Sequence, residues 1–118
     1  MTERQRLPDR RESRIETIEF DGIVYDVNFG FHPDLDDGRI KEVFIAAQAK
    51  HKHGSTIQCL SSDAAVLISM LLQHGVEPAG IGHSLLAVGG LTSTATAPAS
   101  IISCVIDRIE EINREGRA

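Results

Sequence analysis

Aromatic residues are scarce in this chain, which has no tryptophan, one tyrosine and four phenylalanines among 118 residues. Proteins that hold single-stranded nucleic acid usually stack its bases on exposed aromatic side chains, so this class of binder is disfavoured. The core must be aliphatic, built from isoleucine, leucine, valine and alanine. One domain of this length has a modest core of its own. We therefore expect a symmetric partner, and a homodimer is the simplest.

Cysteine is also scarce, since Cys59 and Cys104 are the only two and lie far apart in the sequence. No apolar secretory segment opens the chain, and no apolar run approaches the roughly 18 residues that span a membrane. These absences predict a cytoplasmic protein with reduced thiols and no membrane association. Both cysteines fall within apolar helical patterns, where a free cysteine behaves as a small hydrophobe.

Positive charge is in deficit overall, because the formal net charge is -5 and the sequence pI is about 5.4. An acidic chain is a poor general binder of DNA or of anionic membranes. The exception is the N-terminus, where arginines cluster at Arg4, Arg6, Arg10, Arg11 and Arg14. We interpret residues 1–13 as a flexible leader and residues 14–115 as a single domain. A nucleic-acid-binding arm is the alternative for the leader.

Three strands are predicted in the first half of the chain. The first covers residues 14–20 and is followed by Asp21-Gly22, a dipeptide that strongly favours a hairpin turn. The second covers residues 23–29 and alternates cleanly between apolar and polar positions. A turn-rich loop then leads to a third strand over residues 40–47, antiparallel to the second. The three strands form a meander with one face to be covered.

Three helices are predicted after the strands. The central one, between about Gly54 and Gly75, carries one apolar line at Ile57, Leu60, Ala64, Leu67 and Leu71, and a second at Ala65, Ile68 and Leu72. Together the lines predict that more than half of its circumference is covered. A short helix covers about residues 78–86, a flexible loop residues 87–97, and a last helix begins at Pro98. Strands first and helices after give an α+β fold with the helices on one face of the sheet.

A candidate anion site precedes the central helix. Its residues are Lys50, His53, Gly54, Ser55 and Thr56. Free N–H groups at a helix N-terminus bind anions, and the lysine adds positive charge, so a phosphate or a nucleotide is the ligand that fits. The P-loop pattern is absent. The simpler interpretation is that Ser55 or Thr56 only caps the helix.

A metal site is a weaker hypothesis in the same segment. His51 and His53 are two residues apart and could face one metal ion. Two ligands do not make a site, and His74, His83, Cys59 and Cys104 show no second paired spacing. We predict no metal and no other cofactor.

Several short segments together resemble a known domain. They are Glu42-Val43-Phe44-Ile45, Gly54-Ser55-Thr56-Ile57, Leu72-Gln73-His74-Gly75-Val76, Ser100-Ile101-Ile102 and Asp107-Arg108-Ile109. In this order they resemble the TSCPD domain, which occurs at the C-terminal end of adenosylcobalamin-dependent (class II) ribonucleotide reductases and as small stand-alone proteins of bacteria and phages. The resemblance covers roughly residues 15–112.

The chain departs from that family at the motif that gives the domain its name. Ser103-Cys104-Val105-Ile106-Asp107 stands where the family has Thr-Ser-Cys-Pro-Asp, and only Asp107 keeps its place. Chemistry tied to the family cysteine therefore does not carry over. A chain of 118 residues is also too short for the catalytic barrel of a ribonucleotide reductase.

Three functions follow from these patterns. The leading hypothesis is a non-catalytic binding or assembly module that resembles a detached reductase accessory domain, self-associates, and acts with a protein partner. The alternative is a regulatory protein that binds a nucleotide or phosphate in the loop before the central helix. A metal-dependent enzyme using His51 and His53 is the least favoured.

Overall fold

The computed structural model describes residues 12–32, 38–48, 56–85, 87–88 and 97–115. The elements run in the order β1 (Ser13–Phe20), β2 (Ile23–Phe31), β3 (Ile40–Ala47), α1 (Thr56–Gln73), α2 (Pro78–Ser84), β4 (Ala87–Val88), β5 (Ala97–Pro98) and α3 (Ile101–Glu115). The predicted α+β order, with three strands before three helices, is confirmed. The predicted leader, residues 1–13, falls almost entirely outside the described residues.

The sheet is an antiparallel meander in the order β1-β2-β3. Its first turn is the predicted one, because Phe20 pairs with Ile23 and the two residues between them, Asp21 and Gly22, both have positive φ angles of 51° and 79°. Two such residues define the type I′ turn whose twist matches a hairpin. The register between β2 and β3 places Val27 opposite Ile45. The meander is therefore set by local turn chemistry and by alternation.

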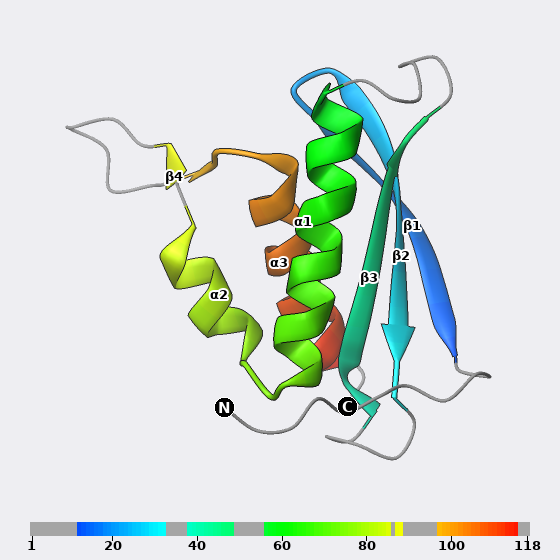
Figure 1. Cartoon of the computed structure of the whole chain (residues 1–118), viewed down its shortest axis with the longest axis vertical. Coiled ribbons are helices and arrows are strands. Elements are labelled where there is room, and N and C mark those ends of the chain that lie inside the picture. Colours follow the sequence, from blue (N-terminus) through cyan, green and yellow to red (C-terminus); the bar gives the residue numbers. More distant parts are fainter. Residues whose placement is uncertain (1–11, 33–37, 49–55, 86, 89–96, 116–118) are drawn as a thin grey trace.

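The core lies between one face of this sheet and the helices (Figure 1). From the sheet it takes Tyr25, Val27 and Phe29 of β2 together with alternate residues of β3, all of them buried. Residues of α3 close the core from the other side, and these are Ile101, Val105, Ile106, Ile109 and Ile112. The short helix α2 packs mainly against α3. The core is thus aliphatic, as the composition predicts.

Helix α1 runs along the open edge of β3 and satisfies the backbone of that strand with polar side chains (Figure 1). The Val43 N–H donates to Ser69 Oγ at 2.9 Å, and the Ser69 hydroxyl lies 3.1 Å from the Val43 carbonyl. Gln73 Nε2 donates to the Lys41 carbonyl at 3.1 Å, and the Ala47 N–H donates to Gln58 Oε1.

This side-chain ladder closes an edge that could otherwise pair with another strand. It also fixes the rotation of α1 about its own axis, because the bonding residues all lie on one side of the helix. Lys41 adds a further contact from the strand, since its Nζ donates to the Leu72 carbonyl at 3.3 Å. A cation near the last turn of a helix is favoured by the helix dipole.

Two sequence predictions about the later segments are wrong. The last helix begins at Ile101 and not at Pro98, which lies in β5. Ser100 precedes the helix, and its hydroxyl accepts the Ser103 N–H at 3.5 Å, as an N-cap residue does. The described ends of the predicted loop over residues 87–97 form a two-residue pairing, with Ala87 opposite Pro98 and Val88 opposite Ala97.

A charged cluster joins β1 to α3. The guanidinium of Arg108 donates to both oxygens of Glu16, from Nε at 2.7 Å and from Nη2 at 2.9 Å, and Arg14 lies 2.7 Å from the same carboxylate. The hydrogen bonds from Arg108 are the main cause that holds the pKa of Glu16 below its ordinary value of 4.5, although partial burial opposes them. Because 19% of the Glu16 side chain is exposed, this pair is better shielded from solvent than a surface pair.

We predict that Ser69→Ala lowers the free energy of unfolding by about 1–3 kcal/mol, because the buried Val43 N–H then has no acceptor from α1. Urea unfolding followed by circular dichroism measures this. Ser84→Ala is the matched control, since the exposed Ser84 hydroxyl bonds only within α2, to the Gly80 carbonyl. An equal loss in both variants would contradict the role given to the ladder.

We predict that Arg108→Gln costs about 1–3 kcal/mol at neutral pH, the range for a hydrogen bond to a charged group. The lowered pKa of Glu16 stabilises the fold above pH 4.5, and this contribution is lost as the pH falls through the pKa of the folded state. The difference between wild type and variant should therefore shrink on acidification. Urea titrations from pH 7 to pH 3 measure it, with the exposed Arg114 changed to Gln as control. A difference that does not change with pH would argue against the pair.

Candidate functional site

The predicted anion site lies almost wholly outside the described residues. Lys50, His53, Gly54 and Ser55 all precede the described start of α1, as does His51. Thr56 is the first residue of α1 and is exposed. The structure therefore neither assembles this site nor argues against it, and a phosphate or nucleotide ligand there stays a prediction.

The described part of the chain brings together no group of three or more His, Cys, Asp or Glu side chains that could hold a metal. The two cysteines differ in their surroundings. Cys59 is exposed on α1, contrary to the expectation that both behave as small hydrophobes in apolar patterns. Cys104 is half-buried on α3, and burial together with the nearby charge of Asp107 raises the pKa of its thiol. A raised pKa lowers the fraction of reactive thiolate at neutral pH.

The most distinctive surface is an apolar line on the outer side of α1, which we call the α1 stripe. It consists of Ile57, Leu60, Ala64, Leu67 and Leu71. Leu60 and Leu67 are 63% and 61% exposed. The sequence prediction that both apolar lines of this helix are covered is therefore wrong for this one. Only the second line, Ala65, Ile68 and Leu72, is buried.

The exposure of the stripe follows from what the rest of the helix does. The ladder of Gln58, Ser69 and Gln73 turns one side of α1 toward the edge of β3. The second apolar line lies beside that ladder and packs into the core. At 100° per residue, the polar ladder and the second apolar line together occupy the inward half of the helix surface. The α1 stripe is left on the outside.

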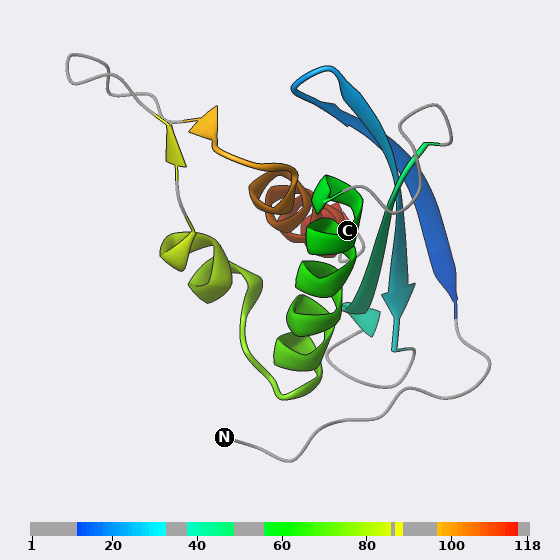
Figure 2. The same cartoon turned by 45° about the horizontal axis from the view of Figure 1, so that its top comes forward.

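A groove adjoins the α1 stripe at its N-terminal half. It has a volume of about 440 Å³ and is lined by residues from the β1–β2 hairpin end and from the starts of α1 and α3. Figure 2 shows where these three parts of the fold lie. Ile57, Leu60 and Ala64 line it and also belong to the stripe. The opposite walls come from Phe20, Ile23, Tyr25, Ile101 and Ile102. Stripe and groove thus form one continuous apolar surface.

On length and composition alone, α1 could also cross a membrane. It has 18 residues, and a third of it is buried. It is not an unbroken apolar run, because Asp63 and several polar residues interrupt it, so the sequence-based expectation that no apolar run approaches this length stands as a prediction. The polar ladder sets α1 apart from an ordinary spanning helix, because its side chains bond the backbone of β3.

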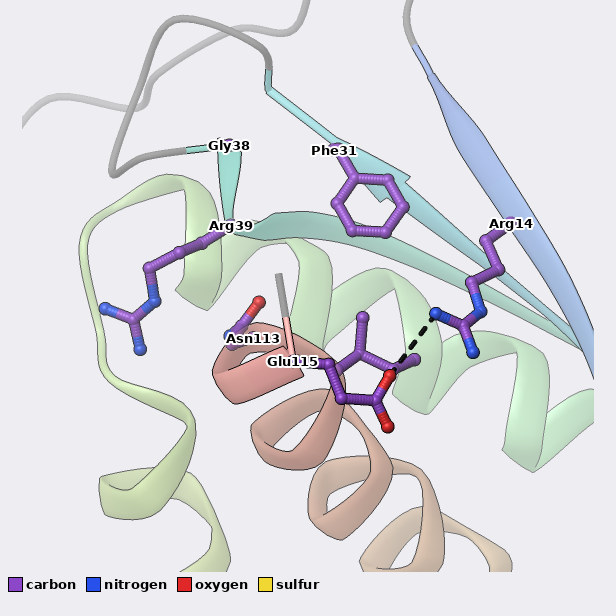
Figure 3. A pocket seen from close by; sticks show the side chains of 7 residues that line it. Arg14, Phe31, Gly38, Arg39, Asn113 and Glu115 are labelled. Carbon is purple, nitrogen blue, oxygen red and sulfur yellow. Dashed lines mark ion pairs between the residues drawn. The ribbon is translucent and has the colours of Figure 1, made fainter. Parts of the chain in front are cut away.

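A second cavity lies at the other end of α3. It measures about 290 Å³ and is lined by Arg14, Phe31, Gly38, Arg39, Ile112, Asn113 and Glu115. Figure 3 shows Arg14 on one side of it, pointing toward Glu115, and Arg39 beside Asn113 on the other side, with its guanidinium directed away from Arg14. Each arginine is paired with a carboxylate at the rim. Arg39 Nη2 lies 2.9 Å from Glu77, and Arg14 Nη1 lies 3.6 Å from Glu115.

Sequence reasoning missed both of these places. The α1 stripe was identified as a line of apolar residues but assigned to the core. The Arg39 and Asn113 region gave no motif, because these residues are 74 positions apart in the sequence and meet only through folding.

Comparison with known proteins links the chain to one enzyme over a short region. It is 33% identical over 76 residues to a vitamin B12-dependent ribonucleotide reductase of Bradyrhizobium diazoefficiens, and the match covers 64% of this chain and 6% of the relative. It is 30% identical over 105 residues to a protein of the same name from Agrobacterium fabrum, with 77% of this chain and 8% of the relative covered.

The chain therefore spans less than a tenth of the length of the curated relatives it matches. No family model matches it, and no solved structure matches it. The similarity supports a relationship to a small region of the vitamin B12-dependent ribonucleotide reductases.

Proposed function

We propose that this protein is a non-catalytic assembly module that pairs with a second copy of itself through the α1 stripe. The observation that carries the proposal is an apolar line of five residues spaced 3-4-3-4 along one helix, in which Ile57, Leu60, Leu67 and Leu71 are exposed and Ala64 is half-buried. That spacing is the a/d seam of a coiled coil, the pattern with which one helix packs against another. A soluble monomer gains nothing from exposing such a seam.

The geometry of the stripe suits a two-fold symmetric pair. Ala64 is its central residue, with Leu60 and Leu67 next on either side and Ile57 and Leu71 at the ends. A two-fold axis near Ala64 places the stripe of one copy against the same stripe of the second copy. An interface between identical chains related by two-fold symmetry requires this. The small alanine side chain lets two helices cross closely at that point.

The groove beside the stripe strengthens the case for a protein partner. Ile57, Leu60 and Ala64 form one of its walls, so a second α1 laid on the stripe can place large apolar side chains into the groove. The interface then gains an area beyond one helix face, which a stable complex needs.

A membrane surface suits the same helix less well. Helices that lie on anionic membranes carry Lys or Arg beside their apolar face. The only charged residue of α1 is Asp63, and the whole chain has a net charge of -5. The charge pattern therefore favours a second protein surface over a lipid surface.

The similarity to the reductases adds the biological setting of the proposal. We infer that the chain is a detached relative of an accessory region of those enzymes, of the TSCPD type that its sequence resembles. The non-catalytic part of the proposal rests on size, because the matched region is only 6–8% of the relatives' length. A scaffold of this kind can bind and assemble without carrying the reaction.

We predict that Leu67→Glu weakens the pair by at least roughly 30-fold, since a glutamate buried in the seam costs about 2 kcal/mol or more. Sedimentation velocity over a concentration series measures the dissociation constant. Val66→Glu is the matched control, because Val66 is 50% exposed on the same turn but lies off the stripe. The control should assemble like wild type.

Three results would argue against the proposed pair. One is a wild-type protein that stays monomeric at high micromolar concentration. Another is an equal loss of assembly in both variants, which would indicate a general effect of added charge. The third is co-sedimentation with phosphatidylcholine vesicles that Leu67→Glu abolishes, which would assign the stripe to a membrane.

A further inference from the structure

Asn113 is a buried side chain with a free hydrogen-bond donor. It lies near the end of α3 and is only 7% exposed. Its Oδ1 accepts the Ile40 N–H at 3.0 Å, which fixes the orientation of the amide. Its Nδ2 has no partner among the described residues. A buried donor without a partner is unfavourable, so such a group indicates a ligand or a water molecule.

Two arginines line the cavity of Asn113, together with the carboxylate of Glu115. The Ile40 N–H donates to Asn113 Oδ1, and Arg39 is the residue directly before Ile40. This hydrogen bond therefore keeps the backbone of Arg39 close to Asn113. The Arg39 side chain is 24% exposed, and Arg14 enters the cavity from the opposite side (Figure 3). Arginine presents a planar set of N–H donors that matches the two oxygens of a carboxylate or a phosphate.

The carboxylates at the rim of the cavity are at the surface, although Arg14 also lies 2.7 Å from the less exposed Glu16. Glu77 and Glu115 have exposed side-chain fractions of 65% and 54%. Exposed ion pairs contribute little to stability, so a ligand can displace either carboxylate into water at little cost. Arg39 is thereby held in place without being committed to Glu77, whereas Arg14 remains paired with Glu16.

We propose that this cavity binds the oxyanion of a small ligand, a carboxylate or a phosphate group, through Arg39 and Asn113 Nδ2 with Arg14 on the far side. The volume of about 290 Å³ admits a small organic anion, and the ring of Phe31 forms an apolar wall for its body. The inference is independent of the proposed pairing through α1, because it uses no residue of that helix.

The Asn113 side-chain amide is directly observable by NMR, and we predict that its two proton resonances shift when the oxyanion binds. Titration of the full-length ¹⁵N-labelled protein with phosphate, acetate and benzoate, each against sodium chloride of equal ionic strength, gives the affinity. Saturation by phosphate assigns a phosphate ligand, and saturation by acetate or benzoate assigns a carboxylate. Either result supports the site.

Two variants distinguish a ligand site from a structural ion pair. Arg39→Gln should weaken binding by more than roughly tenfold, since charge-assisted hydrogen bonds are lost. Glu77→Gln should tighten binding by roughly two- to five-fold, because it frees Arg39 from its exposed partner. A purely structural pair would make both variants behave alike.

The proposal is wrong if none of the three anions moves the Asn113 resonances beyond the chloride control, because a water molecule then satisfies Nδ2. It is also wrong if Arg39→Gln leaves the titration unchanged, because the anion then binds without the predicted contacts.

Discussion

The bonding of α1 to the open edge of β3 is the constraint on which the rest of the structure depends. A three-stranded sheet has two edges, and β3 forms one of them. Gln58, Ser69 and Gln73 meet the backbone groups of that edge with amides and hydroxyls. A helix bound in this way cannot roll, because rotation would break every rung of the ladder together. The bonding of α1 to β3 therefore determines which residues of the helix face the core and which face outward.

The exposed seam is the direct consequence of that contact. Ala65, Ile68 and Leu72 follow the ladder around the helix and enter the core, and α3 completes that core from the side away from the sheet. No described element covers the α1 stripe. The protein thus combines a closed β3 edge with an open helix seam, so that strand pairing at β3 is blocked while helix pairing is favoured.

The sequence predicted the backbone better than it predicted the surface. Alternation over residues 23–29 and the Asp21-Gly22 turn fix the meander locally, and Gly75 has the positive φ of 87° expected where α1 ends. The two apolar lines of α1, however, have the same spacing and similar residues. Periodicity cannot say which of them is buried. The feature that distinguishes the two apolar lines is the polar line of Gln58, Ser69 and Gln73, which lies beside the second one. It can be interpreted only when the position of β3 is known, because these side chains bond the backbone of that strand.

The two proposed surfaces occupy opposite ends of α3. The groove beside the stripe involves Ile101 and Ile102, whereas the oxyanion cavity involves Ile112 and Asn113. These positions are on the order of 16 Å apart at 1.5 Å per residue. The proposed assembly and the proposed anion binding therefore use separate parts of one scaffold. This separation suits an accessory module that holds a larger assembly together while it senses a small anion.

The most direct test of this account is an isotope-filtered methyl NOE experiment on a mixture of labelled and unlabelled protein. The account predicts contacts between copies among the methyl groups of Leu60, Leu67 and Leu71. It also predicts that the methyl groups of Ile68 and Leu72 contact only residues of their own chain. Contacts of Leu60 and Leu67 with core residues of the same chain, and none between copies, would contradict both the outward direction of the seam and its role in assembly.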